Sequence, residues 1–352
     1  MKTIHIPASL EYDVLIERGL LSEVGSKIDR IIGVSAAVIV SDDLVDPLYG
    51  DTVAQSLEKA GIRSFRFVFP HGESSKTIST WGRLQEFLCS VRLTRGDAII
   101  ALGGGVVGDL AGFAAATYQR GIAYCQIPTT LLAMVDSSVG GKTAVDLEHG
   151  KNMVGSFHQP SLVLCDPLVL RTLPEEEYRC GCAEIIKYGM IGSEEFFHSL
   201  SRIPVRDQVE DVVSACVQMK RRYVMEDERD TGLRMMLNFG HTFGHAAEAC
   251  SHFSVKHGQG VAIGMSIISR AACKRGILSA ADLDALLSTI RRYDLPSEAS
   301  WSAEQMAEAA ASDKKASGAS VRLIIPEKIG QCRIEKVSVS ELRSWLRDGG
   351  VA

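Results

Sequence analysis

The sequence lacks long hydrophobic runs. No apolar run among its 352 residues reaches the roughly 20 residues that a membrane-spanning helix needs. The first residues, MKTIHIPASLEYDVLIERG, show no basic segment followed by an apolar one, which a secretory signal would have. We therefore expect a cytoplasmic protein that does not enter a membrane.

An excess of charge of either sign is also missing. The net charge is −5, and 23% of the residues are charged, so nothing in the composition favours binding to nucleic acid or to an anionic membrane. The nine cysteines are odd in number and mostly lie in apolar runs such as LVLC and AEAC. Because Cys180-x-Cys182 lacks a second pair at zinc-site spacing, we expect reduced structural thiols. These features favour a small-molecule partner.

The chain exceeds the length of about 250 to 300 residues at which a single hydrophobic core stops growing, so two domains are expected. In the first half, β-rich runs at residues 36–43, 64–70 and 97–105 alternate with helical patterns at 53–61 and 81–90. Such alternation predicts a parallel sheet covered by helices. This half is predicted to be an α/β domain.

After Pro167 the pattern changes to an apolar spacing near 3.6 residues, which is typical of helices. The predicted helical segments are residues 183–189, 212–226, 241–249, 260–276 and 280–293, and a short strand is predicted at 321–326. The sequence thus predicts an α/β domain over residues 1–167 and a mainly helical domain over residues 168–352.

A glycine-rich turn follows the predicted strand in DAIIALGGGVVGDLAGFAAA. Glycines between a strand and a helix let backbone N–H groups approach a phosphate at the helix N-terminus. The pattern is not G-x-G-x-x-G, and no acidic residue stands at the usual ribose position, so a tight turn without a ligand is an equal alternative. Asp42, at the end of an earlier strand, is a further candidate for the same ligand.

A polar stretch lies between the two halves, in IPTTLLAMVDSSVGGKTAVDLEHGKNMVGSFHQP. Asp136, Lys142, Lys151 and Asn152 are interspersed there with Gly, Ser and Thr. These side chains suit an anionic, hydroxylated ligand such as a polyol phosphate. The alternative is a solvated loop.

Three histidines lie close together in LNFGHTFGHAAEACSHFSVKHGQG. On a helix, His241 and His245 would share one face, at the spacing that a metal requires. Thr242 stands where a zinc protease has its glutamate, so that mechanism is excluded. Glu184 is the candidate carboxylate ligand, because an acid among apolar residues needs a proton, a cation or a metal. Single histidines on apolar helices are more often hydrogen-bonded core residues, which is the alternative here.

Five long motifs resemble the 3-dehydroquinate synthase family of sugar-phosphate cyclases: GGGVVGDLAGFAAATYQRG, IPTTLLAMVDSSVGGKTAVD, GKNMVGSFHQP, AEIIKYG and LNFGHTFGHAAE. The resemblance implies a Rossmann-like N-terminal domain, a helical C-terminal domain and an active site in the cleft between them. It also implies bound NAD, a divalent metal (Zn²⁺ or Co²⁺) and a homodimer. The implied reaction converts 3-deoxy-D-arabino-heptulosonate 7-phosphate into 3-dehydroquinate and phosphate, in the shikimate pathway to aromatic amino acids.

The family pattern also implies roles for individual residues. It replaces the His241–His245 pair by a metal site of Glu184, His241 and His257, and it assigns His245 to the substrate. The implied NAD positions are Asp42, Glu73, Lys76, Gly104, Gly105, Val106, Asp109, Thr129, Thr130, Leu132, Asp136, Ser137, Lys142, Lys151, Thr172, Leu173 and Glu177. The implied catalytic and substrate positions are Arg120, Asp136, Lys142, Asn152, Lys187, Lys220, Asp230, Arg234, Asn238 and His245, together with Lys314 or Lys315.

Three residues depart from the family pattern. Asp230 stands where glutamate is usual, Leu44 replaces a polar residue near the adenosine, and Val169 replaces a larger apolar residue near the nicotinamide. We expect these changes to affect cofactor affinity and positioning more than the type of reaction.

By the family mechanism, NAD oxidises a ring alcohol, phosphate is eliminated, the same NADH reduces the ketone, and the ring opens and closes by an aldol step. The metal polarises the hydroxyl, His245 relays its proton, and Lys142, Asn152 and Arg120 bind the phosphate. Three alternatives stay open. One is a metal-dependent polyol dehydrogenase, one is a sister cyclase of the valiolone, deoxy-inosose or amino-substrate type, and one is a non-catalytic nucleotide-binding protein.

Overall fold

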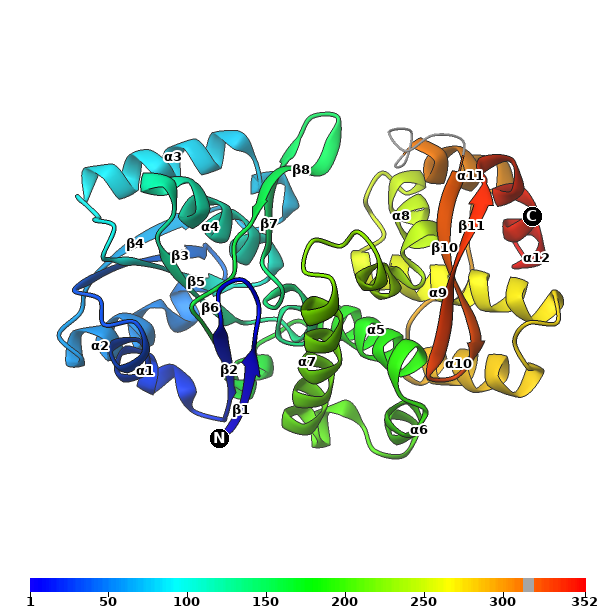
Figure 1. The fold of residues 1–352 in the computed structure, drawn as a ribbon, viewed down its shortest axis with the longest axis horizontal. Coiled ribbons are helices and arrows are strands. Elements are labelled where there is room, and N and C mark those ends of the chain that lie inside the picture. The colour runs from blue at the N-terminus through cyan, green and yellow to red at the C-terminus, as the bar shows by residue number, and fades with distance from the viewer. Residues whose placement is uncertain (313–319) are drawn as a thin grey trace. The chain divides into compact units, whose positions relative to one another are not determined.

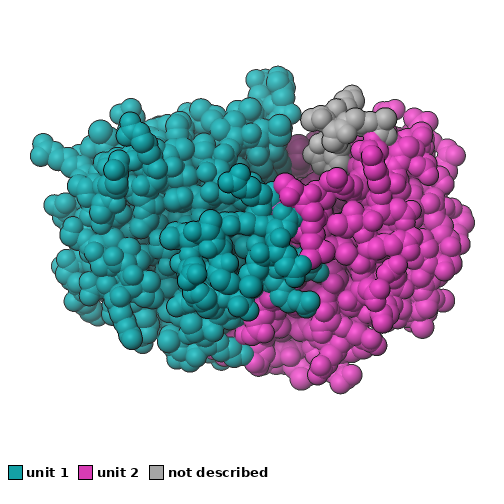
Figure 2. All heavy atoms as spheres, viewed as in Figure 1, with its two compact units in different colours: residues 1–174, 220–229 teal, residues 175–219, 230–352 magenta. Residues whose placement is uncertain are grey.

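The computed structural model describes residues 1–312 and 320–352, and the chain divides into two compact units. Unit 1 comprises Met1–Pro174 and Lys220–Arg229, and unit 2 comprises Glu175–Met219 and Asp230–Ala352 (Figure 2). The chain therefore passes from one unit to the other after residues 174, 219 and 229. These compact units do not test the functional domains predicted for residues 1–167 and 168–352, which stay a prediction.

Unit 1 is built on a seven-stranded sheet (Figure 1). Its strands, in spatial order, are β1 (Lys2–Ile6), β2 (Tyr12–Ile16), β9 (Leu162–Cys165), β6 (Ala123–Pro128), β5 (Ala98–Gly103), β3 (Ala36–Asp42) and β4 (Arg63–Phe69). Every neighbouring pair is parallel except β1 with β2. The α/β, Rossmann-like fold predicted for the first half is confirmed.

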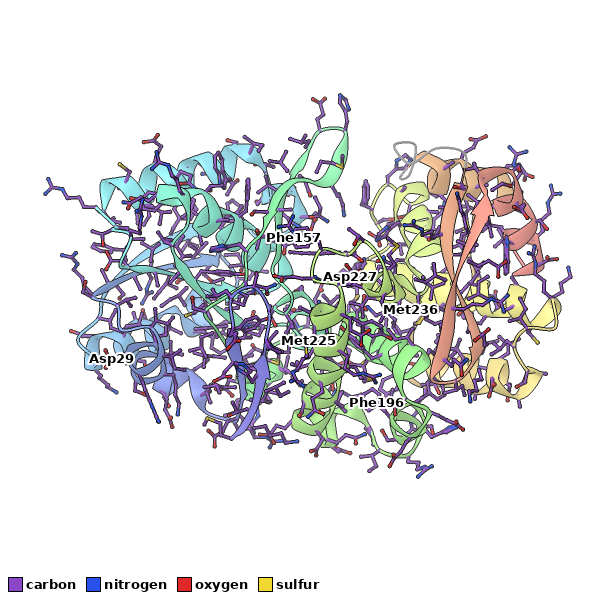
Figure 3. The ribbon with its side chains drawn as sticks, in the orientation of Figure 1. Asp29, Phe157, Phe196, Met225, Asp227 and Met236 are labelled. Atoms are coloured by element: carbon purple, nitrogen blue, oxygen red, sulfur yellow. The ribbon has the colours of Figure 1, made fainter. Side chains whose placement is uncertain are left out.

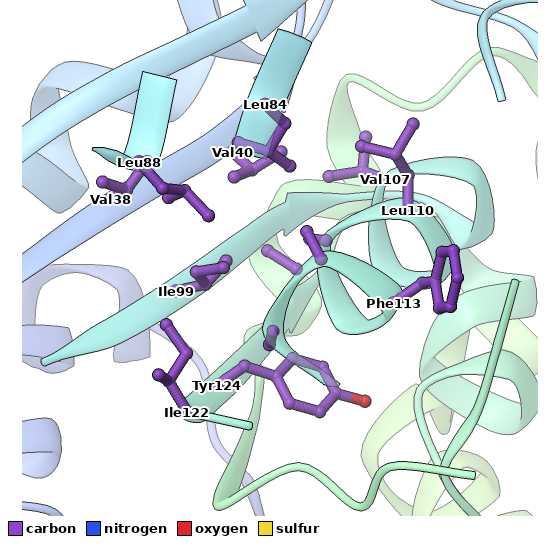
Figure 4. Close-up of a cluster of buried hydrophobic side chains, with 14 of the residues drawn as sticks. Val38, Val40, Leu84, Leu88, Ile99, Val107, Leu110, Phe113, Ile122 and Tyr124 are labelled. Carbon is purple, nitrogen blue, oxygen red and sulfur yellow. The ribbon is translucent and has the colours of Figure 1, made fainter. Parts of the chain in front are cut away.

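Helices alternate with these strands. They are α1 (Val24–Ile31), α2 (Asp51–Lys59), α3 (Ile78–Ser90) and α4 (Gly105–Thr117), with short turns η1 (Leu20–Glu23), η2 (Asp46–Gly50), η3 (Glu73–Ser75), η4 (Tyr118–Arg120), η5 (Ala133–Ser137) and η6 (Pro167–Arg171). Valines and isoleucines of β3 and β5 pack against leucines of α3 and α4 (Figure 4). Most residues of α4 are buried in the core. The packing of this helix therefore fixes the position of the glycine turn that precedes it.

A two-stranded ribbon, β7 (Lys142–Leu147) with β8 (Gly150–Phe157), extends from unit 1 (Figure 1; Phe157 is labelled in Figure 3). The backbone N–H of Asp146 donates to the carbonyl of Lys76 at 2.8 Å, which ties the ribbon to the loop after β4. The polar stretch between the two halves of the sequence, for which a solvated loop was the alternative, thus forms a regular hairpin over about half of its length.

The segment Lys220–Arg229 belongs to unit 1 although unit 2 surrounds it in sequence. It contains the end of α7 (Val209–Glu226), near the labelled Met225 and Asp227 of Figure 3. Glu228 accepts hydrogen bonds from the Ser9 hydroxyl at 2.6 Å and from Nε2 of Gln159 at 2.8 Å. These contacts join the segment to two separate parts of unit 1.

Unit 2 is mainly helical, as predicted. Its helices besides the first part of α7 are α5 (Glu175–Gly192), α6 (Glu194–Arg202), α8 (His241–Cys250), α9 (His257–Lys274), α10 (Ala280–Arg292), α11 (Ala303–Ser312) and α12 (Leu342–Asp348), with turns η7 (Val205–Asp207), η8 (Leu233–Asn238) and η10 (Val339–Glu341). The predicted strand at 321–326 lies in β10 (Ser320–Lys328), which pairs antiparallel with β11 (Gln331–Ser338). No helix within residues 1–312 and 320–352 is both long and apolar enough to span a membrane.

Glycines bring α8 and α9 into backbone contact. A Cβ atom on Gly264 would lie 1.9 Å from the carbonyl oxygen of Gly240, and one on Gly244 would lie 2.8 Å from that of Gly260. On the other side of α9, a Cβ on Gly258 would lie 2.3 Å from Cα of Cys180 in α5. The three helices therefore pack too closely for any side chain at these positions.

The cysteines of the chain all lie within the described residues, and all are free thiols. Most are buried, Cys180 and Cys182 among them. Burial raises the pKa of the Cys180 thiol to about 11, so this thiol stays protonated at neutral pH. The burial of most thiols agrees with a structural role, and their reduced state stays a prediction.

Candidate metal and cofactor sites

Three side chains from three helices of unit 2 converge. Glu184 lies in the middle of α5, and His241 and His257 are the first residues of α8 and α9. Oε1 of Glu184 lies 3.5 Å from Nε2 of His241 and 3.2 Å from Nε2 of His257. One ligand atom from each residue lies within 4.8 Å of the other two. The glycine contacts between α5, α8 and α9 set this spacing.

The protonation of His241 suits a metal ligand. Its Nδ1 lies 3.2 Å from the carbonyl oxygen of Phe239, which can only accept, so Nδ1 carries the proton and Nε2 keeps its lone pair. Burial holds the pKa of His241 well below its usual range, so the ring is neutral. A neutral imidazole with its lone pair toward Glu184 is the form that binds a cation.

Glu184 is fully buried, and such a charge needs a partner. Nζ of Lys187, one turn later in α5 and also buried, contacts Oε2 of Glu184. The other oxygen faces the two histidines. Two imidazole nitrogens and one carboxylate oxygen match the three protein ligands of a catalytic zinc site, which leaves the fourth position for water or substrate.

His245 follows His241 by one turn of α8, and the centres of their rings are 5.5 Å apart. It belongs to a second group of possible ligands, with Glu248 and His257. Glu248 was missed in the sequence analysis. Its signal was the spacing H-x-x-x-H-x-x-E, which places His241, His245 and Glu248 on one helix face.

In unit 1, candidate cofactor residues follow the carboxyl ends of parallel strands. Gly103 of β5 pairs with Pro128 of β6, and the next residues are Gly104 and Thr129. Because parallel strands end at the same sheet edge, Asp42, Gly104 and Thr129 lie along one edge. A Cβ on Gly104 would lie 3.0 Å from Cγ2 of Thr130. The bare backbone at the start of α4 therefore fits a phosphate group.

Lys76 joins two residues that were predicted for different ligands. Its Nζ, in a side chain only 4% exposed, lies 2.6 Å from Oδ2 of Asp109 and 2.5 Å from Oδ1 of Asn152. Burial would lower the pKa of Lys76, but Asp109 and Glu73 outweigh it and raise the pKa. Asn152 has a left-handed backbone with φ of 57°, and its N–H donates to Asp146 at 2.7 Å. Lys76, which was predicted to bind NAD, thus holds Asn152, which was predicted to bind the substrate.

A second ion pair in unit 1 joins Lys220 and Asp136. Nζ of Lys220 lies 2.5 Å from Oδ1 and 2.7 Å from the backbone carbonyl of Asp136. Both residues were predicted for the substrate. Their contact is one of those that join the segment Lys220–Arg229 to the rest of unit 1.

The remaining predicted residues are distributed over both units. Thr172 bonds to the hydroxyl of Tyr49, Glu177 pairs with Lys256, and Arg234 is buried. Lys142, Lys151, Asn238 and Arg120 are exposed. The other predicted positions, Val106, Leu132, Ser137 and Leu173 among the NAD residues and Asp230 among the catalytic ones, are half-buried. Lys314 and Lys315 lie outside the described residues.

Of the three departures from the family pattern, Leu44 is 56% exposed and Val169 is buried. The carbonyl of Val169 accepts a hydrogen bond from Tyr49. Asp230 has a left-handed backbone with φ of 56°. Any residue at position 169 could accept the hydrogen bond from Tyr49, because it uses the backbone carbonyl and not the side chain.

Comparisons with known proteins agree with these features. The model of the 3-dehydroquinate synthase N-terminal domain matches residues 66–180, and the model of its C-terminal domain matches residues 181–316. The chain is 43% identical over 343 residues to the 3-dehydroquinate synthase of Streptococcus sanguinis, with 96% of this chain and 97% of that protein covered. It is 42% identical over 354 residues to that of Clostridium acetobutylicum, with 99% of each covered.

Solved structures show the same fold. A 2-deoxy-scyllo-inosose synthase complexed with carbaglucose-6-phosphate, NAD⁺ and Co²⁺ has a TM-score of 0.88 at 26% identity and covers 99% of this chain and 100% of that one. A 2-epi-5-epi-valiolone synthase from Streptomyces hygroscopicus with NAD⁺ and Zn²⁺ has a TM-score of 0.86 at 30% identity and covers 96% of each. The matches along nearly the whole length show that this chain belongs to the 3-dehydroquinate synthase family.

Proposed function

We propose that this chain is a 3-dehydroquinate synthase, which converts 3-deoxy-D-arabino-heptulosonate 7-phosphate into 3-dehydroquinate and phosphate. The observation that carries the proposal is the convergence of Glu184, His241 and His257 on one possible cation position, in a chain of this family. The relatives that are 42–43% identical over nearly their full lengths carry this name.

NAD and a divalent metal are the proposed cofactors, since both solved cyclases above bind NAD⁺ with Co²⁺ or Zn²⁺. NAD supplies a hydride acceptor that is regenerated within the cycle, and the metal supplies a Lewis acid. Glu184, His241 and His257 would hold the metal. The glycine turn and the strand ends around Asp42 and Thr129 would hold NAD.

The chain's own side chains would do the proton transfer and the anion binding. His245, one helical turn from His241, would accept and return the proton of the reacting hydroxyl, because imidazole can carry a proton either way near neutral pH. Lys142, Asn152 and Arg120 would bind the phosphate through charge and hydrogen bonds. Lys76 would hold Asn152 in place for this contact.

Two alternatives are less well supported. The sister cyclases share the fold but are 26–30% identical, compared with 42–43% for the 3-dehydroquinate synthases. Solved alcohol and glycerol dehydrogenases are 13–15% identical with TM-scores near 0.65, which shows the fold alone. A homodimer and a cytoplasmic location stay predictions from the family resemblance.

The test is phosphate release from the heptulosonate 7-phosphate with zinc and substoichiometric NAD, while absorbance monitors NADH. We expect many phosphates per NAD without accumulation of NADH, followed by identification of 3-dehydroquinate. Steady NADH formation from simple polyols without phosphate release would contradict the proposal and indicate a dehydrogenase. Cyclisation of only another sugar phosphate would indicate a sister cyclase.

A further inference from the structure

The imidazole of His257 has a carboxylate at each of its two nitrogens. Oε1 of Glu184 lies 3.2 Å from Nε2, and Oε1 of Glu248 lies 3.0 Å from Nδ1. The first carboxylate belongs to the candidate metal ligands. The second belongs to the other group of possible ligands, with His245, and has no assigned role.

The carboxylate of Glu248 is held in place by its surroundings. The side chain is 7% exposed and lies in the last turn of α8, where the helix crosses α9. A Cβ on Gly260 would approach Cγ of Glu248 to 3.1 Å and its Oε1 to 3.2 Å, so the carboxylate packs directly against the backbone of α9. Gly260 follows His257 by one turn, and the carboxylate is therefore fixed relative to the ring.

We propose that Glu248 is a positioning residue for the metal, which accepts the Nδ1–H hydrogen bond of His257 and so keeps the Nε2 lone pair directed at the cation. A neutral imidazole carries one proton and one lone pair, and a carboxylate at Nδ1 favours the proton on that nitrogen. The inference rests on the metal site of the proposed function.

The same arrangement occurs at His241, where the carbonyl of Phe239 takes the place of the carboxylate. Both rings therefore offer Nε2 toward Glu184. A charged acceptor makes a stronger hydrogen bond than a carbonyl and also increases the basicity of the ligand nitrogen. We therefore expect Glu248 to strengthen the bond from His257 to the metal in two ways, by fixing the ring and by making Nε2 more basic.

A competing interpretation makes Glu248 a ligand itself, since one ligand atom each of His245, Glu248 and His257 also lie within 4.8 Å of one another. The two interpretations differ in what a neutral isostere does. The amide of Glu248→Gln can still accept from Nδ1–H, so a positioning role is kept in part. An amide is a poor replacement for a carboxylate ligand, so a ligand role is lost.

The experiment measures the affinity of the metal-stripped full chain for Zn²⁺ by chelator competition, and the visible spectrum of its Co²⁺ form. Glu248→Ala should weaken Zn²⁺ binding by about 10- to 100-fold, with Glu248→Gln between it and the unmodified protein. At saturating zinc, both variants should recover most of their kcat. Ser266→Ala is the matched control, because this buried hydroxyl of α9 donates to the carbonyl of Ala262 in its own helix, and it should leave the affinity unchanged.

Zinc affinity of Glu248→Ala equal to that of the unmodified protein would overturn the inference. A loss in Glu248→Gln as large as that in Glu184→Gln would also overturn it, because it would make Glu248 a ligand. Should Glu248→Ala fail to fold, the glutamine variant alone decides. Failure of the proposed function is a separate result, in which the unmodified protein binds zinc but releases no phosphate. An unmodified protein that binds no zinc would overturn both.

Discussion

Nε2 of His257 lies 3.2 Å from Oε1 of Glu184, although 73 positions separate the two residues in the chain. The contact exists because α5, α8 and α9 meet through glycines, which bring the starts of two helices to the middle of a third. The candidate metal ligands are therefore a product of helix packing, and changes in that packing should affect metal binding.

Glu184→Gln should remove the metal and also destabilise unit 2. The amide is a weak ligand, and Lys187, with 1% of its side chain exposed, loses the charge of the Glu184 carboxylate; breaking a buried ion pair costs about 3–5 kcal/mol. Urea unfolding and zinc content would measure the two effects. Adding Lys187→Met should restore much of the stability without restoring zinc, and recovery of zinc in the double variant would contradict the assignment.

His245→Ala should lower kcat by about 100- to 10,000-fold, the range expected for loss of a general acid–base group. Metal content should stay at the level of the unmodified protein, because His245 lies outside the group of Glu184, His241 and His257. Zinc analysis of the purified variant checks this division. If zinc is lost together with activity, His245 is a ligand.

Lys76→Met should weaken binding of NAD and of the phosphorylated substrate together. The variant removes the ammonium group that joins Asp109 and Asn152, and charge-assisted hydrogen bonds contribute about 1.5–3 kcal/mol each. We expect at least a roughly 10-fold rise in the Kd for NAD, measured by calorimetry, and a higher KM. The control is Lys59→Met on the exposed face of α2. If this variant raised the Kd for NAD and the KM as much as Lys76→Met does, the role given to Lys76 would be wrong.

Gly264→Ala should destabilise the protein by on the order of 3 kcal/mol, the upper range for overpacking, because the new methyl group meets the carbonyl of Gly240, the residue just before α8. Zinc affinity should also fall as α8 and α9 separate. Gly82→Ala in α3 is the control, since no atom of residues 1–312 or 320–352 outside its own helix turn and chain neighbours lies within 4 Å of its Cβ position, and it should gain roughly 0.5–1 kcal/mol. Equal unfolding free energies for the two variants would contradict the close packing.

Asp97→Asn should lower stability at pH 7 and lose its effect in acid. Burial raises the pKa of Asp97, but hydrogen bonds from Thr94, Ala36 and Ser35 outweigh it and lower the pKa. The stabilisation is therefore complete above the unfolded-state pKa of about 3.9 and disappears as the pH falls through the folded-state pKa. Urea unfolding should show that the difference in unfolding free energy between the unmodified protein and Asp97→Asn is smaller near pH 3 than at pH 7. An equal difference at both pH values would contradict a stabilisation by the ionised carboxylate.

Much of the fold follows from sequence pattern. The run predicted as a strand at 36–43 is β3 at Ala36–Asp42, because a parallel strand buried on both faces reads as continuous apolar sequence. The hairpin of β7 and β8 was not predicted. Most of β8 is exposed and it carries glycines at 150 and 155, so it lacks the alternation that marks a half-buried strand.

The candidate site was predictable in part. Spacing within one helix identified His241 and His245 as neighbours, but it could not show that His257 approaches Glu184, since that depends on how two helices start against a third. Only resemblance to the family supplied His257. Glu248 had a signal in its spacing, yet its contact with Nδ1 of His257 depends on the backbone of Gly260, which no periodicity reveals.

The return of residues 220–229 to unit 1 has a consequence for synthesis on the ribosome. Glu228 bonds to Ser9 and Gln159, and Lys220 pairs with Asp136, so unit 1 lacks these partners when residue 174 emerges. At roughly 5–20 residues per second, the completing segment follows about 3 to 11 seconds later. During that interval the nascent N-terminal part exposes polar groups whose partners are still being translated, and its folding cannot finish before the first helices of unit 2 have been synthesised.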